Sequence, residues 1–330
     1  MIGIRPPETP VVVVLCENLE ERPGHLDPLR SQFELRFTDA GRLPDAIVGA
    51  QVLFLWDFFS SAVEQVWDRC TDLQWIHVAA AGIDTLLFPR LVSSDVVVTN
   101  ARGTFDRPIA EFVLTSVLAH AKLLHESHDL QSRHQWLHRE TRSVAGARVL
   151  VVGTGAIGRE IARLLAAAGL HVRGAGRSPH DADPDFGTLV SSADLPTHVG
   201  WADYIVNATP LTDATRGLFD AAVFASMKPT AHFINIGRGA SLVEADLLAA
   251  LTTHSIDGAS LDVFETEPLP ADSPLWDAPG LVVSAHMSGD VIGWRDTLAR
   301  QFVDNAERWL ASKPLLNVVD KSLGYVKAAS

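Results

Sequence analysis

Three side chains in the second half of the chain could together reduce a carbonyl group that lies next to a carboxylate. Arg238 lies in INIGRGA, Glu267 in LDVFETEPLP, and His286 at the end of VVSAH. A guanidinium can bind both oxygens of a carboxylate in a fork, and an imidazole can exchange a proton with a carbonyl oxygen near neutral pH. A carboxylate hydrogen-bonded to that imidazole would orient the ring and favour its charged form. These residues predict acid–base chemistry on a 2-oxo or 2-hydroxy acid.

A glycine-rich turn indicates where the hydride donor would bind. Gly153, Gly155 and Gly158 have G-x-G-x-x-G spacing in ARVLVVGTGAIGREIARLLAAAG, after an apolar run and before a helical pattern. Such a turn lets the backbone approach a pyrophosphate, and the N-terminus of the following helix offers N–H groups to it. With Ala156 and Ile157 at the start of that helix, the segment predicts a dinucleotide site.

The strand that should end at the adenosine ribose carries no acidic residue at its end. In HVRGAGRSP the expected position is Gly176, followed by Arg177 and Ser178. An acid there would bind the 2′-hydroxyl of NAD, whereas a nearby arginine accommodates the 2′-phosphate of NADP. The segment predicts that NADP(H) is the favoured cofactor and that NAD(H) is possible. The alternative is that Arg177 has no cofactor role and is a solvated arginine on a loop.

The elements that would position these residues are buried strands alternating with helices. Continuous apolar runs rich in Val and Ile are typical of strands buried on both faces of a parallel sheet. Helical patterns separate most of these runs, which predicts an α/β fold with two doubly wound parallel sheets. Five runs come before residue 101, at 11–16, 33–37, 52–56, 75–79 and 96–100, and six follow, at 147–153, 170–176, 204–209, 232–237, 258–263 and 281–286.

The two groups of strands predict two domains. Residues 1–100, joined by residues 288–330 with one long helix, would bind the substrate, and residues 101–287 would bind the dinucleotide. Ligands of open α/β sheets bind at the carboxyl ends of strands. Asp262, at the end of SLDV, is therefore placed to hold the nicotinamide carboxamide.

Composition excludes several other classes of protein. The net charge of −13 would repel nucleic acid, and no run of Lys or Arg offsets it. No apolar run is long enough for a membrane span, and the N-terminal residues do not resemble a signal peptide, so we expect a cytoplasmic protein. Cys16 and Cys70 do not make a disulfide framework or a metal motif.

Four histidines near helical spacing raise the alternative of a metal site. They are His120, His125, His128 and His134. No cysteine and no convergent set of carboxylates accompanies them, so we predict a polar helix face and no metal.

The combined motifs resemble the D-isomer-specific 2-hydroxyacid dehydrogenase family. The matching stretches are VVGTGAIG, NATPLTDATRGL, MKPTAHFINIGRGASLVE, LDVFETEPLPADSPLW and SAHMSG, with AAAGID and VTNARGTF earlier, so the similarity covers nearly the whole chain. The resemblance implies a flavodoxin-like substrate domain, a Rossmann nucleotide-binding domain and an active site in the cleft between them. It also implies that Arg238, Glu267 and His286 are the catalytic residues.

Further roles follow only from the resemblance. Backbone N–H groups near Ala80, Ala81 and Gly82 would bind the substrate carboxylate. Homodimers through the nucleotide domain are common in the family, and Trp136, in the dimer-forming arm, would pack at the interface or reach the partner's cleft. Additional residues lining the cofactor would be Ala208, Thr209, Pro210, Thr215, Ile236, Gly237, Ser288 and Gly289.

The third predicted strand gives information about the substrate. It ends in LFLWDFFSS, where Trp56 and two phenylalanines would form aromatic walls and Asp57 would repel a second anionic group. We therefore expect 3-phosphoglycerate to be a poor substrate. Glyoxylate, hydroxypyruvate, pyruvate and short branched or aromatic 2-oxo acids are better candidates.

The principal functional prediction is reversible reduction of a small 2-oxo acid to the D-2-hydroxy acid, with His286 as acid and base. The family also contains corepressor-like members that sense nucleotides, and a weakly catalytic interaction protein of that kind is the alternative. Formate oxidation, found among relatives, pairs the histidine with Gln, so Glu267 argues against it.

Overall fold

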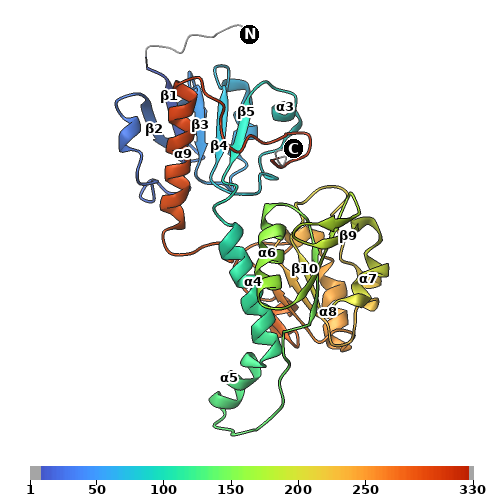
Figure 1. The fold of residues 1–330 in the computed structure, drawn as a ribbon. Helices are drawn as coiled ribbons and strands as arrows, with labels where there is room; N and C mark the ends of the chain where they lie inside the picture. The colour runs from blue at the N-terminus through green and yellow to red at the C-terminus, as the bar shows by residue number, and fades with distance from the viewer. Residues whose placement is uncertain (1–8, 327–330) are drawn as a thin grey trace. The chain divides into compact units, whose positions relative to one another are not determined.

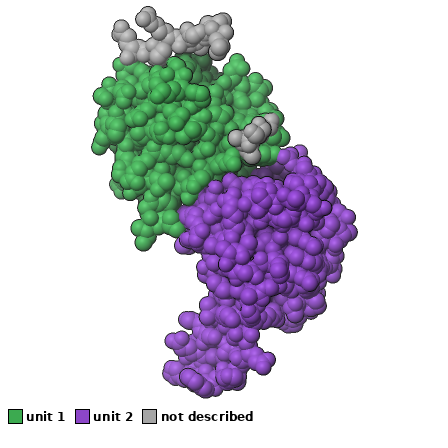
Figure 2. All heavy atoms as spheres, in the orientation of Figure 1, with its two compact units in different colours: residues 1–104, 291–330 green, residues 105–290 purple. Residues whose placement is uncertain are grey.

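The computed structural model describes residues 9–326, which form two compact units. Unit 1 contains the residues up to 104 and those from 291 onward, and unit 2 contains residues 105–290 (Figure 2). The boundaries lie at 104/105 and 290/291, where the sequence suggested 100/101 and 287/288. Each unit is an α/β fold around a mainly parallel sheet, which confirms the predicted fold class.

Unit 1 is built on a five-stranded parallel sheet with the order β2-β1-β3-β4-β5. Its strands are β1 (Val11–Leu15), β2 (Glu34–Thr38), β3 (Val52–Leu55), β4 (Trp75–Val78) and β5 (Val97–Asn100). The central strands β1, β3 and β4 are buried throughout, as their apolar runs predict. The FELRF run was wrongly grouped with them, because β2 is an edge strand that is largely half-buried or exposed.

The helix α9 (Trp294–Leu310) packs on this sheet although it comes from the end of the chain (Figure 1). Leu298, Phe302 and Ala306 are fully buried and recur every four residues, which places them on one helix face. The ring of Phe302 stacks on Phe54 of β3, with 4.0 Å between the ring centroids. Unit 1 also contains α1 (Leu43–Ala46), α2 (Ala62–Gln65) and α3 (Pro89–Val92), with 3-10 turns η1 (Asp27–Leu29) and η2 (Trp67–Arg69).

Unit 2 is built on an eight-stranded sheet with the order β13-β12-β11-β10-β6-β7-β9-β8. Its strands are β6 (Arg148–Val152), β7 (His171–Gly176), β8 (His180–Asp183), β9 (Gly187–Ser191), β10 (Tyr204–Asn207), β11 (His232–Asn235), β12 (Gly258–Leu261) and β13 (Leu281–Val283). The six predicted strands are present, but the hairpin of β8 and β9 was not foreseen. Strand β8 reads HDAD, is mostly exposed and pairs antiparallel with β9, so it lacks the apolar run that signals a buried strand.

The helices of unit 2 are α4 (Asp106–Ala121), α5 (Leu124–Ser132), α6 (Ala156–Ala167), α7 (Ala221–Ala225) and α8 (Glu244–Thr252), with 3-10 turns η3 (Ser192–Thr197), η4 (Val199–Trp201), η5 (Gly239–Ser241) and η6 (Pro274–Asp277). Most of them pack around the sheet, whereas α5 projects away from it beyond the end of α4 (Figure 1). Among the helices within residues 9–326, none is both long and apolar enough to cross a membrane.

One of the histidines predicted to form a polar helix face lies elsewhere. His120, near the end of α4, packs against the ring of His232 with 4.4 Å between centroids, and its Nε2 lies 3.1 Å from a carboxylate oxygen of Asp257. Burial lowers the pKa of His120, although the bond to Asp257 opposes this. The helical spacing could not reveal that the end of α4 contacts the sheet.

Candidate active site

The predicted cofactor residues of unit 2 gather along one edge of its sheet. Strands β6, β7, β10, β11, β12 and β13 are parallel, so their carboxyl ends lie along the same edge. Each strand is followed at that end by predicted site residues, namely Gly153, Arg177, Ala208, Ile236, Asp262 and, after β13, His286. Groups far apart in the sequence are thereby brought to the edge where open α/β sheets bind ligands.

The glycine turn between β6 and α6 leaves no room for side chains at two of its positions. Gly153 has a φ of +107°, and a Cβ there would lie 2.5 Å from the carbonyl oxygen of Ala208. A Cβ at Gly158 would overlap the carbonyl oxygen of Gly153, whereas one at Gly155 would meet open space. The backbone of the turn is thus closely packed at Gly153 and Gly158. The space beside Gly155, directly before the N-terminus of α6, is open. This arrangement fits a bound pyrophosphate.

The end of β7 has the polar groups that the sequence predicts, and a salt-bridge cluster holds the hairpin that follows. Arg177 and Ser178 are exposed beyond the last residue of the strand. Within the hairpin, Asp183 is 6% exposed and accepts hydrogen bonds from both terminal nitrogens of Arg159, at 3.0 and 2.9 Å. Arg159 also contacts Asp185 at 2.7 Å. Because Arg159 directly follows Gly158 in α6, the cluster joins the phosphate turn to the hairpin that starts after Ser178.

A buried asparagine network, which the sequence analysis missed, supports the middle of this edge. Asn207 and Asn235 end β10 and β11, and both are fully buried. The amide nitrogen of Asn207 donates to Oδ1 of Asn235 at 2.9 Å and to Oγ of Ser241 at 2.6 Å. Oδ1 of Asn207 accepts bonds from the N–H and the hydroxyl of Thr209. The sequence did contain a signal for this network, because an asparagine ends each of the two apolar runs. A buried amide needs hydrogen-bond partners.

The same network orients the loops that carry the predicted cofactor residues. Oδ1 of Asn235 accepts the N–H of Gly237 at 3.1 Å, and the hydroxyl of Ser241 donates to the carbonyl of Arg238 at 2.5 Å. In the neighbouring loop the hydroxyl of Thr215 donates to the carbonyl of Pro210 at 2.7 Å. These bonds fix the backbone on both sides of the edge without using the Arg238 side chain.

Arg238 follows β11 at the carboxyl edge and is half-buried. Its Nη1 donates to the carbonyl of Gly237 at 2.8 Å, which bends the guanidinium back over its own turn. The next residue, Gly239, is so close to Phe264 that a side chain there would overlap the Phe264 carbonyl. The turn of Arg238 is therefore packed directly against the chain that leads to Glu267.

Glu267 and His286 form the carboxylate–imidazole hydrogen bond that the sequence predicts. Nδ1 of His286 lies 2.7 Å from Oε2 of Glu267, and Oε1 of Glu267 accepts the N–H of Phe264 at 2.9 Å. Burial opposes ionisation of Glu267, but these two bonds and the charges of His286 and Arg238 outweigh it. The pKa of Glu267 is therefore below its usual value, and the group is a carboxylate at neutral pH.

Asp262 anchors the loop that carries His286. It is 1% exposed, and its Oδ1 accepts the hydroxyl of Ser284 at 2.7 Å and the N–H of Met287 at 2.9 Å. The N–H of Ser288 approaches both oxygens, at 3.2 and 3.0 Å. His286 itself has a φ of +51°, an uncommon conformation for a residue other than glycine. The predicted contact of Asp262 with a nicotinamide carboxamide stays a prediction, whereas its hold on this loop is observed.

The substrate residues predicted in unit 1 lie beyond the ends of β3 and β4. The carbonyl of Ala80 accepts the N–H of Ala101 at 2.9 Å, and the carbonyl of Ala81 accepts the amide of Asn100 at 2.5 Å. Trp56 is only 9% exposed, and its Nε1 donates to the carbonyl of Glu21 at 3.1 Å. Its indole thus packs mainly inside unit 1, while Phe59 is exposed. Substrate contact by Trp56 stays a prediction.

The fold and the site together define a class of protein. Unit 2 combines a Rossmann-type order of parallel strands, a glycine turn and a carboxylate–imidazole pair along one edge. Those features belong to dehydrogenases that bind a nicotinamide dinucleotide.

Comparison with known proteins gives the family. The family model described as D-isomer specific 2-hydroxyacid dehydrogenase, NAD binding domain, matches residues 114–288. The chain belongs to the D-isomer specific 2-hydroxyacid dehydrogenase family, and it is an enzyme of that type.

Relatives and solved structures support this assignment. A glyoxylate/hydroxypyruvate reductase A from Photorhabdus laumondii is 30% identical over 77% of this chain and 82% of its own length. An (S)-sulfolactate dehydrogenase from Chromohalobacter salexigens is 31% identical over 73% and 79%. The crystal structure of an NADPH-dependent glyoxylate/hydroxypyruvate reductase from Sinorhizobium meliloti, in complex with NADP and sulfate, has a TM-score of 0.82. It is 30% identical and covers 96% of this chain and 100% of that one.

Proposed function

We propose that the enzyme reduces a small 2-oxo acid to the D-2-hydroxy acid with NADPH, and that it catalyses the reverse reaction. The bond of 2.7 Å between Nδ1 of His286 and ionised Glu267 carries this proposal. We assign Nε2 of His286 to proton exchange with the substrate, because Nδ1 is engaged by the carboxylate of Glu267. The D configuration follows from the family.

Side chains of the protein bind the substrate and transfer the proton, and the cofactor supplies the hydride. When bound, the nicotinamide supplies a hydride to C2 of the oxo acid. Arg238 binds the substrate carboxylate, and Glu267 orients the ring of His286 through Nδ1. His286 donates a proton to the carbonyl oxygen, so hydride and proton together make the alcohol. In the oxidative direction His286 removes the hydroxyl proton.

Within unit 1, we assign the backbone N–H groups near residues 80–82 to the substrate carboxylate. A hollow of about 100 Å³ beyond β1 and β3 is lined mainly by carboxylates and aromatic rings, among them Asp57 and Phe59. Its cation, Arg295, is already paired with Glu21 at 3.1 Å. Burial and the charge of Glu17 raise the pKa of Asp57, which indicates that negative charge is already crowded there. Such a surface disfavours phosphorylated substrates, so glyoxylate, hydroxypyruvate and pyruvate are the proposed class.

The preference for NADPH rests on the end of β7. Gly176 stands where an acid would repel a 2′-phosphate, and Arg177 and Ser178 supply donors for one. The Sinorhizobium reductase, which shares this fold, was solved with NADP.

The test is a substrate panel assayed with both nucleotides. Glyoxylate and hydroxypyruvate should be reduced faster with NADPH than with NADH, and His286→Ala should lower kcat by about 10²–10⁴-fold, as for a lost general acid. Turnover that is best with phosphohydroxypyruvate, or a near-normal kcat for His286→Ala, would contradict the proposal.

We also propose that the enzyme is a homodimer. The segment from α5 to residue 147 projects from the body of unit 2 (Figure 1). It exposes Leu124, Leu137 and Trp136, the last at 99%. Apolar side chains gathered on one projecting arm suit burial against a second copy. Light scattering should give twice the chain mass, and Trp136→Glu should shift the protein toward the monomer; a monomeric wild type would refute the assignment.

A further inference from the structure

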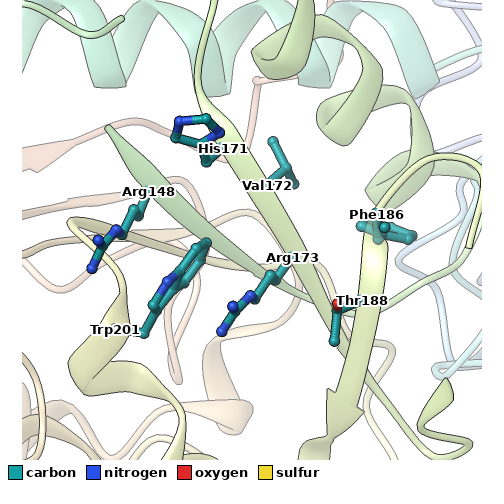
Figure 3. Close-up of a pocket in the computed structure, with 8 residues that line it drawn as sticks. Arg148, His171, Val172, Arg173, Phe186, Thr188 and Trp201 are labelled. Carbon is teal, nitrogen blue, oxygen red and sulfur yellow. The ribbon is translucent and has the colours of Figure 1, made fainter. Parts of the chain in front are cut away.

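A hollow of unit 2 lies at the edge of the sheet opposite the glycine turn. It has a volume of about 370 Å³ and is lined by Arg148, His171, Val172, Arg173, Phe186, Gly187, Thr188 and Trp201 (Figure 3). Arg148 is the first residue of β6, whereas the glycine turn follows the last residue of the same strand. At about 3.3 Å of rise per residue, the length of β6 separates this hollow from the cofactor residues.

The strand register explains why two arginines face the same hollow. Arg173 of β7 pairs with Leu150 of β6, and Arg148 lies two residues before Leu150, so all three side chains point to one face of the sheet. Leu150 is part of the core that η3 and η4 cover. These short turns connect β9 to β10 in place of a long helix, and they leave the amino ends of β6 and β7 uncovered.

Trp201 at the end of η4 lies between the two guanidinium groups (Figure 3). The central guanidinium carbon of Arg173 is 4.2 Å from the centroid of the indole ring, and that of Arg148 is 5.8 Å away. Stacking on an aromatic ring orients a guanidinium and leaves its N–H edge available for hydrogen bonds. The guanidinium of Arg173 is therefore oriented before any ligand arrives, and that of Arg148 lies within range of the same ring.

Neither arginine forms a salt bridge within residues 9–326, although the chain carries 40 acidic residues against 27 basic ones. Asp203 interacts electrostatically with Arg148 but forms no salt bridge with its guanidinium. Its carboxylate accepts hydrogen bonds from Lys228 at 2.6 Å and from the backbone N–H of Arg148 at 2.9 Å. Two positive charges thus remain side by side without a carboxylate to bind them.

We propose that this hollow binds a small multivalent oxyanion, a phosphate ester or a polycarboxylate, at a site separate from that of the cofactor. An oxyanion placed over the edge of Trp201 would accept charge-assisted hydrogen bonds from both guanidinium groups. It would also relieve their mutual repulsion. The site needs little ordering of side chains, which lowers the entropic cost of binding.

The experiment is isothermal titration of the full chain, saturated with NADPH, with pyrophosphate and separately with citrate. Wild-type protein should bind at least one of them, and Arg148→Gln/Arg173→Gln should weaken that binding by about tenfold or more, the size expected for lost charge-assisted bonds. Arg133→Gln is the matched control, because this exposed arginine of the arm bonds only backbone oxygens and lies outside the hollow. A ligand that carries phosphoryl groups is indicated if pyrophosphate binds more tightly, and a polycarboxylate if citrate does.

Anion binding at the catalytic site must be distinguished from binding here. Arg238→Gln should leave the titration unchanged, since Arg238 lies at the opposite edge of the sheet. Loss of binding in Arg238→Gln, unchanged binding in the double variant, or no binding to wild type would each overturn the proposal. If the double variant does not fold, Arg148→Gln alone, with its exposed side chain, should still weaken binding about threefold or more.

Discussion

The imidazole of His286 bonds through Nδ1 to Oε2 of Glu267 at 2.7 Å, while the other oxygen of Glu267 is held by the N–H of Phe264 at 2.9 Å. Glu267 is therefore oriented from two sides, and its lowered pKa keeps it ionised. Since His286 stands in a left-handed backbone conformation on a loop tied to Asp262, the ring is positioned by both its backbone and its partner.

Replacing Glu267 with Gln should preserve a hydrogen bond to His286 but remove the negative charge beside its ring. We expect kcat for 2-oxo acid reduction to fall by about tenfold to a hundredfold, because a neutral amide supports proton transfer by the imidazole less well than a carboxylate does. The measurement is kcat and KM at pH 7, with Glu265→Gln, a neighbouring exposed acid, as the control. A kcat equal to that of the wild type would show that the charge of Glu267 has no part in the reaction.

Replacing Arg238 tests the proposed carboxylate contact. Arg238→Gln removes a charge-assisted pair of bonds, so kcat/KM should fall by roughly 10–100-fold. Arg238→Lys keeps the charge but loses the fork and should recover only part of that loss. The measurement is kcat and KM for glyoxylate with saturating NADPH. Equal kcat/KM for the Gln and Lys variants would mean that charge has no part in binding the substrate.

The cofactor preference should depend on Arg177. Arg177→Ala is expected to lower kcat/KM for NADPH by about tenfold and to change that for NADH by less than about twofold, because only NADPH has a 2′-phosphate to bind. The check is the ratio of kcat/KM for the two nucleotides at a fixed glyoxylate concentration. Arg30→Ala, at an exposed arginine of unit 1, serves as the control. Parallel losses with both nucleotides would rule out phosphate recognition by Arg177.

The bond between Arg159 and Asp183 should stabilise unit 2 above the pH range in which Asp183 titrates. Bonds from Arg159 lower the pKa of this buried acid to about 2. A lowered pKa stabilises the folded state fully above the unfolded value near 3.8, and the gain is lost as the pH falls toward about 2. Asp183→Asn should therefore lower the free energy of unfolding by about 2 kcal/mol at pH 7. The difference from wild type should shrink toward pH 2.

Thermal unfolding followed by circular dichroism from pH 7 to pH 2 provides the measurement. Asp181→Asn, in the same hairpin but exposed and with no ion pair within the described residues, is the matched control. A destabilisation by Asp183→Asn that is the same at every pH would show that the carboxylate charge contributes nothing.

The sequence alone indicated the candidate site residues and the order of the buried strands. Arg238, Glu267 and His286 were candidates because of their residue types and the strands before them. The glycine turn was a candidate because glycines at that spacing are needed where the backbone is closely packed. Periodicity is a local property, so runs such as VVVVLC could be assigned to buried strands without knowledge of their neighbours.

Only the tertiary structure decided which side chains meet. The bond between Glu267 and His286, the hold of Asp262 on Ser288, and the network through Asn207 and Asn235 depend on strands adjacent in the sheet but distant in the chain. The same holds for the polar hairpin β8–β9, which Arg159 secures from another element. A pattern read along one chain cannot encode such pairings, because burial and hydrogen-bond geometry are set by what the other strands and helices place alongside.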